Sequence, residues 1–222
     1  SDQALEGEDS LLWDSGKVPS DEQHFIPYQG SPLTSGKTYY WKVRIWDQDG
    51  KVTPWSTAAS FVTGILHASE WEDSKWIGYE SLPPELNVVP GVHGNGDNLG
   101  EKAVKRAVIP YFRRSFTLNK PVAEAYLFVS GLGHYEASLN GENIGDHFLA
   151  PGWTTYEKRC LYNTYSVKEQ LRQGENVLGG VVGTGFRYVN RERYRKLVRA
   201  EGYPMLRAKL LIRYTDGTSE TI

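Results

Sequence analysis

Apolar and polar residues alternate along two long parts of the chain, and this alternation predicts β-strands. In the first third, "TYYWKVRIW" places Tyr39 and Trp41 on one face and Lys42 and Arg44 on the other, which is the period-2 pattern of a sheet with one buried side. The turn residues "DQDG" at 47–50 and the strand-like "SFVTG" follow, so a hairpin is expected. We interpret both aspartates of "DQDG" as turn residues, because the other ligands of a calcium loop are missing.

Strand patterns return after residue 110 and continue to the end of the sequence. One short helix-like piece is predicted near residues 167–171, and a DG turn precedes the last strand-like segment. Short strands joined by Gly- and Pro-containing turns predict an all-β protein. The expected strands of this region are "YFRRSFTL", "EAYLFVSGLG", "YEASLNG", "ENIGDHFL", "RCLYNTYSV", "NVLGGVVGTG" and "PMLRAKLLIRY".

These patterns divide the chain into four parts with two β-sandwich domains. Residues 1–64 resemble a fibronectin type III-like or immunoglobulin-like sandwich that lacks its first strands, with Tyr39 at the tyrosine-corner position and the ending "DGKVTPWS". Residues 65–81 are expected to be a linker and a first strand, and residues 82–110 an irregular insertion. Residues 111–222 are expected to form a jelly-roll, galactose-binding-like sandwich that is truncated at its C-terminal end.

Composition and charge narrow the classes of partner. The hydrophobic fraction of 39% and the aromatic fraction of 13% are typical of a folded protein. A formal net charge of −2 provides no general field for nucleic acid or anionic membrane, and the basic segment 186–199 is interpreted as a solvated or docking loop. No segment is long and apolar enough to span a membrane. Cys160 is the single cysteine, so no internal disulfide can form.

Candidate chemistry concentrates between residues 130 and 156. His134 and Glu136 share one face of a predicted strand, and we interpret that face as the solvated one, with ligand contact as the alternative. "NG" at residues 140–141 predicts a hairpin turn. Asp146 and His147 are adjacent in a predicted strand and point to opposite faces, so they cannot form a metal site by themselves.

A loop and a glycine-rich strand complete the candidates. "APGWTTYEK" presents Trp153 and Tyr156, and aromatic rings of this kind can stack on the apolar face of a sugar; burial of Trp153 as a core plug is the favoured alternative. "GGVVGTGFR" at 179–187 lacks the third glycine and the following helix of a dinucleotide site, so we interpret its glycines as strand packing.

The long motif "GLGHYEASLNGENIGDHFLAPGWTTYEKRCLYNTYSV", together with "LLWDSGKV", "KWIG" and "YFRRSFTL", resembles the N-terminal region of bacterial α-L-rhamnosidases. The resemblance implies inverting hydrolysis of terminal α-L-rhamnose by acidic residues of a downstream (α/α)6 barrel. None of those catalytic residues can be placed on this chain, which we therefore expect to be inactive alone. Carbohydrate binding is assigned to five residues, Trp153, Tyr156, Asp146, His134 and Arg187.

The expected function is that of a non-catalytic N-terminal part of such a glycosidase. The alternatives are a carbohydrate-binding module for rhamnose-containing glycans and an adhesion-type β-sandwich protein. The resemblance implies the catalytic barrel domain of the same protein and rhamnose-containing glycans as partners, and a periplasmic or secreted location. The resemblance implies no required cofactor. Calcium stays an open alternative as a ligand, because related jelly rolls in some members bind rhamnose with calcium.

Overall fold

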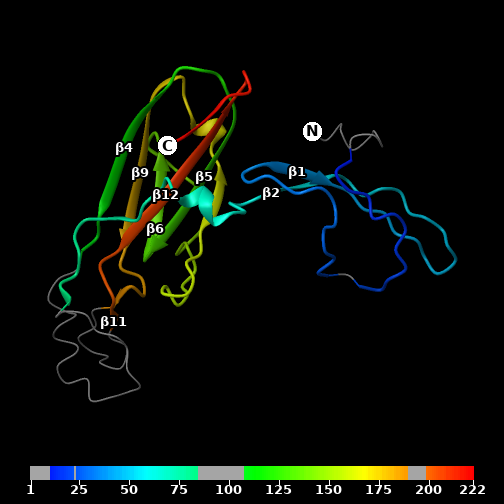
Figure 1. The fold of residues 1–222 in the computed structure, drawn as a ribbon, viewed down its shortest axis with the longest axis horizontal. Coiled ribbons are helices and arrows are strands. Elements are labelled where there is room, and N and C mark those ends of the chain that lie inside the picture. Colours follow the sequence, from blue (N-terminus) through cyan, green and yellow to red (C-terminus); the bar gives the residue numbers. More distant parts are fainter. Residues whose placement is uncertain (1–10, 23, 85–107, 190–198) are drawn as a thin grey trace, which may run out of the picture. The chain divides into compact units, whose positions relative to one another are not determined.

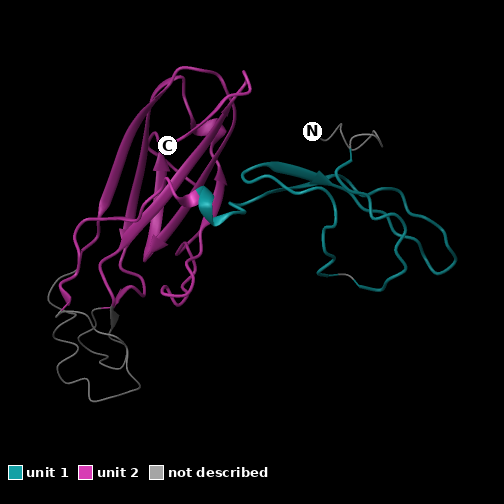
Figure 2. Cartoon of the chain, in the orientation of Figure 1, with its two compact units in different colours: residues 1–70 teal, residues 71–222 magenta. Residues whose placement is uncertain are grey.

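The computed structural model describes residues 11–22, 24–84, 108–189 and 199–222 (Figure 1). The chain forms two compact units, residues 1–70 and residues 71–222 (Figure 2). The described residues contain β-strands and short 3-10 helices and no α-helix, as an all-β protein requires. Most of the expected insertion at 82–110 and most of the basic segment at 186–199 lie outside the described residues.

Unit 1 is built on a hairpin of two short strands. β1 (Thr38–Trp41) and β2 (Ala59–Val62) pair antiparallel. β1 is shorter than the predicted strand, because beyond it hydroxyl oxygens take the place of backbone acceptors: Val43 N donates to Ser56 Oγ at 3.1 Å and Ile45 N to Thr53 Oγ1 at 3.2 Å.

The turn at 47–50 is confirmed. Gly50 N donates to Asp47 O at 3.0 Å, while the Asp47 carboxylate accepts the Asp49 and Lys51 amides at 3.0 and 2.8 Å. Because Asp47 Oδ1 is engaged with two backbone amides, it acts as the turn residue that the sequence indicates.

Tyr39 anchors unit 1 from the position expected of a tyrosine corner. Its hydroxyl accepts a hydrogen bond from Thr34 N at 2.7 Å, and its ring stacks on Phe61 with centroids 5.7 Å apart. Nearby, the buried Thr63 hydroxyl donates to Thr34 O at 2.6 Å. The chain before β1 is therefore tied to both strands of the hairpin.

Unit 2 is a sandwich of two antiparallel sheets. One sheet has the order β13-β12-β5-β8, with β3 also beside β12, and the other has the order β4-β9-β6-β7. β10 and β11 form a separate hairpin. The bounds are β3 (Ile77–Gly78), β4 (Tyr111–Leu118), β5 (Val122–Leu132), β6 (His134–Leu139), β7 (Glu142–Asn143), β8 (Asn163–Ser166), β9 (Gly174–Gly183), β10 (Tyr188–Val189), β11 (Arg199–Ala200), β12 (Met205–Tyr214) and β13 (Ser219–Thr221); the 3-10 helices are η3 (Ala68–Trp71) and η5 (Lys168–Gln170).

The core of unit 2 lies between the two sheets, and it follows the alternation seen in the sequence. On β6, Tyr135, Ala137 and Leu139 are buried, whereas Glu136 is exposed, so the solvated interpretation of Glu136 is confirmed. On β5, Leu127 is 0% exposed. Burying one such side chain stabilises the folded state by about 1.5–3 kcal/mol. The same cluster includes Leu118, Ala125, Val129, Val167, Val182, Leu206, Leu210 and Ile212.

The other face of the β5–β12 pair is covered by the segment that opens unit 2. The Trp71 ring meets Tyr162 edge-on at 5.2 Å and Phe128 at 6.4 Å. The Arg207 guanidinium lies 4.9 Å from the centroid of the Trp71 ring and donates to Trp71 O at 2.5 Å and to Ser74 O at 3.0 Å. This Arg207 clamp fixes residues 71–74 to the sheet.

The hairpin turn at 140–141 is confirmed, but the strand after it is shorter than expected. Asn140 and Gly141 have φ values of 54° and 87°, the left-handed conformations of a two-residue hairpin turn. β7 ends at Asn143, and the predicted continuation through residue 149 is wrong. Gly145 takes φ 75° and packs so close to Tyr165 that a Cβ would lie 2.4 Å from the ring, which turns the chain out of the sheet.

Candidate functional site

Three rings gather where β6 begins and β9 ends. Trp153 and Phe186 have centroids 5.1 Å apart at 36°, and His134 meets Phe186 edge-on at 6.4 Å and 85°. Antiparallel pairing of His134 with Gly183 brings the start of β6 beside the end of β9, so Phe186 follows directly at this edge. We call His134, Trp153 and Phe186 the ring cluster.

The loop that carries Trp153 is closed by its own hydrogen bonds. Tyr135 N donates to Ala150 O at 2.7 Å, the Thr154 hydroxyl donates to Arg159 O, and Arg159 N donates to Thr155 O at 2.9 Å. These contacts hold both ends of the loop against unit 2. Trp153 itself is 47% exposed, so the core-plug interpretation is wrong and the indole presents surface to solvent.

Tyr156 supports the loop from within the fold. Its side chain is buried, and its hydroxyl accepts a hydrogen bond from Gly133 N at 3.3 Å. Gly133 and Gly185 cross closely here, since a Cβ on Gly185 would lie 3.0 Å from Gly133 Cα. The structure therefore places Tyr156 behind the ring cluster instead of beside an exposed face.

The ring cluster offers apolar and hydrogen-bonding surface without net charge. Burial lowers the pKa of His134 below its ordinary value of 6.5, so the imidazole is neutral at pH 7. A neutral imidazole has one donor and one acceptor nitrogen, beside the partly exposed face of Trp153. This combination suits a ligand with both a flat apolar face and hydroxyl groups.

Asp146 lies in a different group of side chains. It is fully exposed, and its carboxylate is 3.8 Å from His147 Nδ1. The His147 ring meets Tyr165 of β8 edge-on at 5.6 Å, whereas Trp153 packs on Phe186. The structure thus groups Asp146 with His147 and Tyr165.

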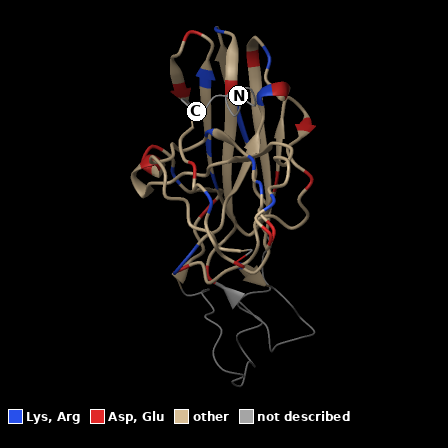
Figure 3. Cartoon of the chain, turned by 90° about the vertical axis from the view of Figure 1, so that its right-hand side faces the viewer, with Lys and Arg blue, Asp and Glu red and all other residues tan. Residues whose placement is uncertain are grey.

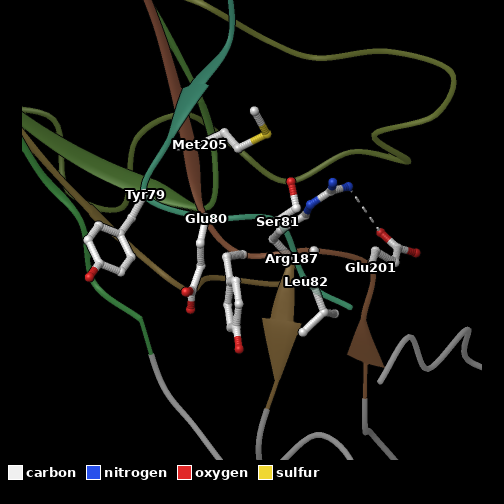
Figure 4. A pocket seen from close by; sticks show the side chains of 10 residues that line it. Tyr79, Glu80, Ser81, Leu82, Arg187, Glu201 and Met205 are labelled. Carbon is white, nitrogen blue, oxygen red and sulfur yellow. Dashed lines mark ion pairs between the residues drawn. The ribbon is translucent and has the colours of Figure 1, made fainter. Parts of the chain in front are cut away.

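Arg187 lines a cleft of about 430 Å³ in unit 2 (Figure 4). Its guanidinium forms an ion pair with Glu201, with 4.0 Å between Nη1 and Oε2. Sequence reasoning identified Arg187 but missed Phe186 and Glu201. The signal for Phe186 was an aromatic residue directly after a glycine-rich strand, and Glu201 gave no signal, because its proximity to Arg187 depends on the β10–β11 hairpin.

The arrangement of charged and metal-ligating side chains excludes few classes of function beyond those that the sequence excluded. Acidic and basic residues are interspersed along the described strands (Figure 3). Within the described ranges, no three His, Cys, Asp or Glu side chains gather in a way that could hold a metal ion. A helix with the length and apolar character needed to cross a bilayer is likewise missing from this part of the chain.

The glycine-rich β9 is strand packing, as predicted. A Cβ on Gly179 would lie 2.6 Å from Ser138 Oγ, and one on Gly180 would lie 2.9 Å from Leu206 Cδ2. These glycines let neighbouring side chains of β6 and β12 approach β9 closely. The segment has the environment of a sandwich core, which is why its glycines do not mark a nucleotide site.

At the level of class, the fold defines an all-β protein of two units, a short immunoglobulin-like unit and a two-sheet sandwich. Residues 120–222 match the family described as the alpha-L-rhamnosidase N-terminal domain, and residues 3–67 match the Rha78A-like, N-terminal immunoglobulin domain. The chain belongs to the α-L-rhamnosidase family, of which it carries the N-terminal region.

Relatives support this placement along almost the whole chain. An alpha-L-rhamnosidase of Formosa agariphila is 37% identical over 213 residues, which cover 93% of this chain and 22% of that protein. The structure of alpha-L-rhamnosidase from Dictyoglumus thermophilum gives a TM-score of 0.75 at 35% identity and covers 100% of this chain and 23% of its own. The crystal structure of the native α-L-rhamnosidase from Aspergillus terreus gives a TM-score of 0.71 at 31% identity. This match covers 92% of the present chain and 22% of the Aspergillus terreus chain. The chain thus spans between a fifth and a quarter of the length of these relatives.

Proposed function

We propose that the chain is the non-catalytic N-terminal part of an α-L-rhamnosidase. The whole protein removes terminal α-L-rhamnose from plant or bacterial glycans with inversion, and the chemistry takes place in a helical catalytic barrel that follows these domains. The observation that carries the proposal is the match of residues 120–222 to the N-terminal domain of this family. The absence of any α-helix from the described residues fits a division of labour in which the barrel lies elsewhere.

The catalytic barrel domain of the same protein is the partner that this proposal implies. The chain covers 22% of the Formosa agariphila protein, which leaves room for such a domain. A periplasmic or secreted location belongs to the same proposal, because the substrates are extracellular glycans.

Turnover of an aryl α-L-rhamnoside tests the catalytic part of the proposal. The 222-residue chain should release no aryl alcohol, whereas the parent protein with the following barrel should do so. Release by the isolated chain, retained after the chain is purified to constant specific activity, would overturn the non-catalytic assignment.

A second candidate function is carbohydrate binding by unit 2, and the ring cluster favours it. The 47% exposure of Trp153 and the neutral His134 beside Phe186 supply a stacking face and hydrogen-bonding atoms. Titration with L-rhamnose, with and without calcium, should change the Trp fluorescence of the wild type. The Trp153→Ala variant should lose that change, and an unchanged response in this variant would exclude the ring cluster as the binding site.

A further inference from the structure

The cleft beside Arg187 has a lining unlike that of the ring cluster. β3 runs along β12 and ends at Gly78, and the chain then leaves the sheet as Tyr79, Glu80 and Ser81. These residues face the end of the β10–β11 hairpin across the cleft, whose volume is about 430 Å³ (Figure 4). That volume lies in the range of small-molecule sites, roughly 300–1,000 Å³.

The Arg187–Glu201 ion pair is positioned by the backbone of the hairpin. Glu201 N donates to Arg187 O at 3.2 Å, which extends the ladder in which Tyr188 pairs with Ala200. The two side chains are therefore neighbours across the hairpin and are mostly buried, with exposed fractions of 18% for Arg187 and 8% for Glu201. Both come from backbone that is held in register, so their separation is set by the fold.

Glycine at position 202 makes room for the guanidinium. Gly202 has a φ of 152°, and a Cβ there would lie 2.6 Å from Arg187 Nη2. The Arg187 guanidinium therefore packs against the backbone of Gly202 at this wall of the cleft. Any larger residue at this position would displace Arg187 from its place next to Glu201.

The ion pair leaves hydrogen-bonding capacity for a ligand. The Arg187–Glu201 separation of 4.0 Å is longer than a hydrogen bond, and both residues line the cleft. A ligand hydroxyl near the pair could accept from the guanidinium and donate to the carboxylate.

The lining selects a neutral polyhydroxylated ligand. Two carboxylates, Glu80 and Glu201, and one guanidinium line the cleft, so an anion would meet more negative than positive charge. The Arg187 guanidinium repels a cation that approaches the ion pair, whereas a neutral hydroxyl group can contact both members of the pair. Tyr79, which is 67% exposed, supplies a ring that can cover the apolar face of a sugar.

We propose that this cleft binds one monosaccharide unit of a neutral glycan. The Arg187–Glu201 pair takes adjacent hydroxyl groups, and the Tyr79 ring covers an apolar face of the sugar. The inference rests on the proposed function only in the choice of L-rhamnose as the first probe. The cleft is separate from the ring cluster in its lining residues, so the two binding sites can be tested independently.

Amide chemical shifts recorded during titration with L-rhamnose, and separately with D-galactose, test the proposal on the full chain. Binding of either sugar should shift the amides of residues 78–82 and 201–203. Tyr79→Ala and Glu201→Gln should each weaken this binding by about tenfold or more, as expected when a ligand loses a stacking ring or one member of a buried charge pair. Tyr111→Ala is the matched control, since Tyr111 is 82% exposed and does not line the cleft.

The outcomes separate the cleft from the other proposals. Binding that survives Trp153→Ala but is weakened in both cleft variants supports the cleft. Binding of D-galactose alone with this pattern also supports the cleft and counts against L-rhamnose as its ligand. Shifts confined to the ring cluster, wild-type affinity in Tyr79→Ala, or no binding of either sugar would overturn it. The non-catalytic assignment is tested by the turnover assay, whose result is independent of sugar binding in the cleft.

Discussion

Asn176 is a polar side chain in the interior of unit 2, where it is 0% exposed. Its Oδ1 accepts from Arg172 N and from Asn140 Nδ2, both at 2.9 Å. Its Nδ2 donates to Arg172 O at 2.8 Å and to Gly174 O at 2.9 Å. One side chain thus ties the chain before β9 to the hairpin turn at 140–141, and every polar atom it carries is satisfied.

Asn176→Ala should lower the free energy of unfolding by about 2–4 kcal/mol, because several buried groups lose their partners at once. Urea unfolding followed by Trp fluorescence measures this change. Asn119→Ala is the control, since Asn119 is exposed and its replacement should change stability by less than about 0.5 kcal/mol. Equal effects of the two substitutions would contradict the role given to the Asn176 network.

Tyr214 gives unit 2 a dependence on alkaline pH. Burial, followed by the hydrogen bond that its hydroxyl donates to Glu220, raises the pKa of the phenol from 10.0 to about 12. Folding therefore favours the neutral phenol. Its stabilisation is fully present below pH 10.0 and is lost as the pH rises through about 12.

Tyr214→Phe should make stability less sensitive to pH between 10 and 12, because phenylalanine has no proton to lose. Urea unfolding by far-UV circular dichroism at pH 8 and at several values in that interval measures the slope. Tyr111→Phe, at an 82% exposed position, serves as the control and should keep the wild-type slope. A Tyr214→Phe slope equal to the wild type would refute the assignment.

At the scale of elements, the turn between β6 and β7 depends on glycine. Gly141 has φ 87°, and a Cβ added there would have no atom within 4 Å. The cost of an alanine at this position is therefore backbone strain alone. Gly141→Ala should lower the free energy of unfolding by about 1–2 kcal/mol. Gly152→Ala is the matched control, because its Cβ would meet only Leu161 Cδ1 at 3.5 Å, an ordinary contact. Urea unfolding of both variants should show the loss in Gly141→Ala alone.

The sequence predicted elements well where one alternating face is buried against the other sheet. β4 covers the segment "YFRRSFTL", and β6 shows the expected in-and-out burial. The predictions were wrong where side chains replace the backbone ladder, as Ser56 and Thr53 do beyond β1. They were also wrong after β7, where the contact of Gly145 with Tyr165 involves a residue that alternation cannot place.

The candidate site was predictable in part for the same reason. The loop at 150–158 indicated Trp153 as a candidate contact residue, but the favoured core-plug interpretation of its ring was wrong. Periodicity placed His134 on the same strand face as Glu136. The partner rings and charges are a product of strand pairing: β6–β9 register brings Phe186 to His134, and the β10–β11 hairpin brings Glu201 to Arg187. Single-sequence patterns do not contain that register.

At the scale of the whole molecule, the described core cluster of unit 2 and the segment that covers β5 lie within one part of the chain. The core cluster runs from Leu118 to Tyr214, with Ile222 packed against it, and the Arg207 clamp joins β12 to Trp71 and Ser74. All of these residues lie within 71–222. A fragment that begins at Trp71 should therefore keep the packing of both sheets and the cover on the outer face of β5.

A fragment of residues 71–222 should fold cooperatively, whereas one that begins at Lys75 should be less stable by about 2–4 kcal/mol. The shorter fragment loses the Trp71 ring from Phe128 and Tyr162 and leaves Arg207 without the acceptors that Trp71 and Ser74 provide, and removal of a packed aromatic ring costs this much or more. Amide spectra and urea unfolding of the two fragments measure the difference. If residues 71–222 give poorly dispersed amide signals, or if both fragments unfold at the same urea concentration, unit 2 depends on other parts of the protein and the clamp does not stabilise it.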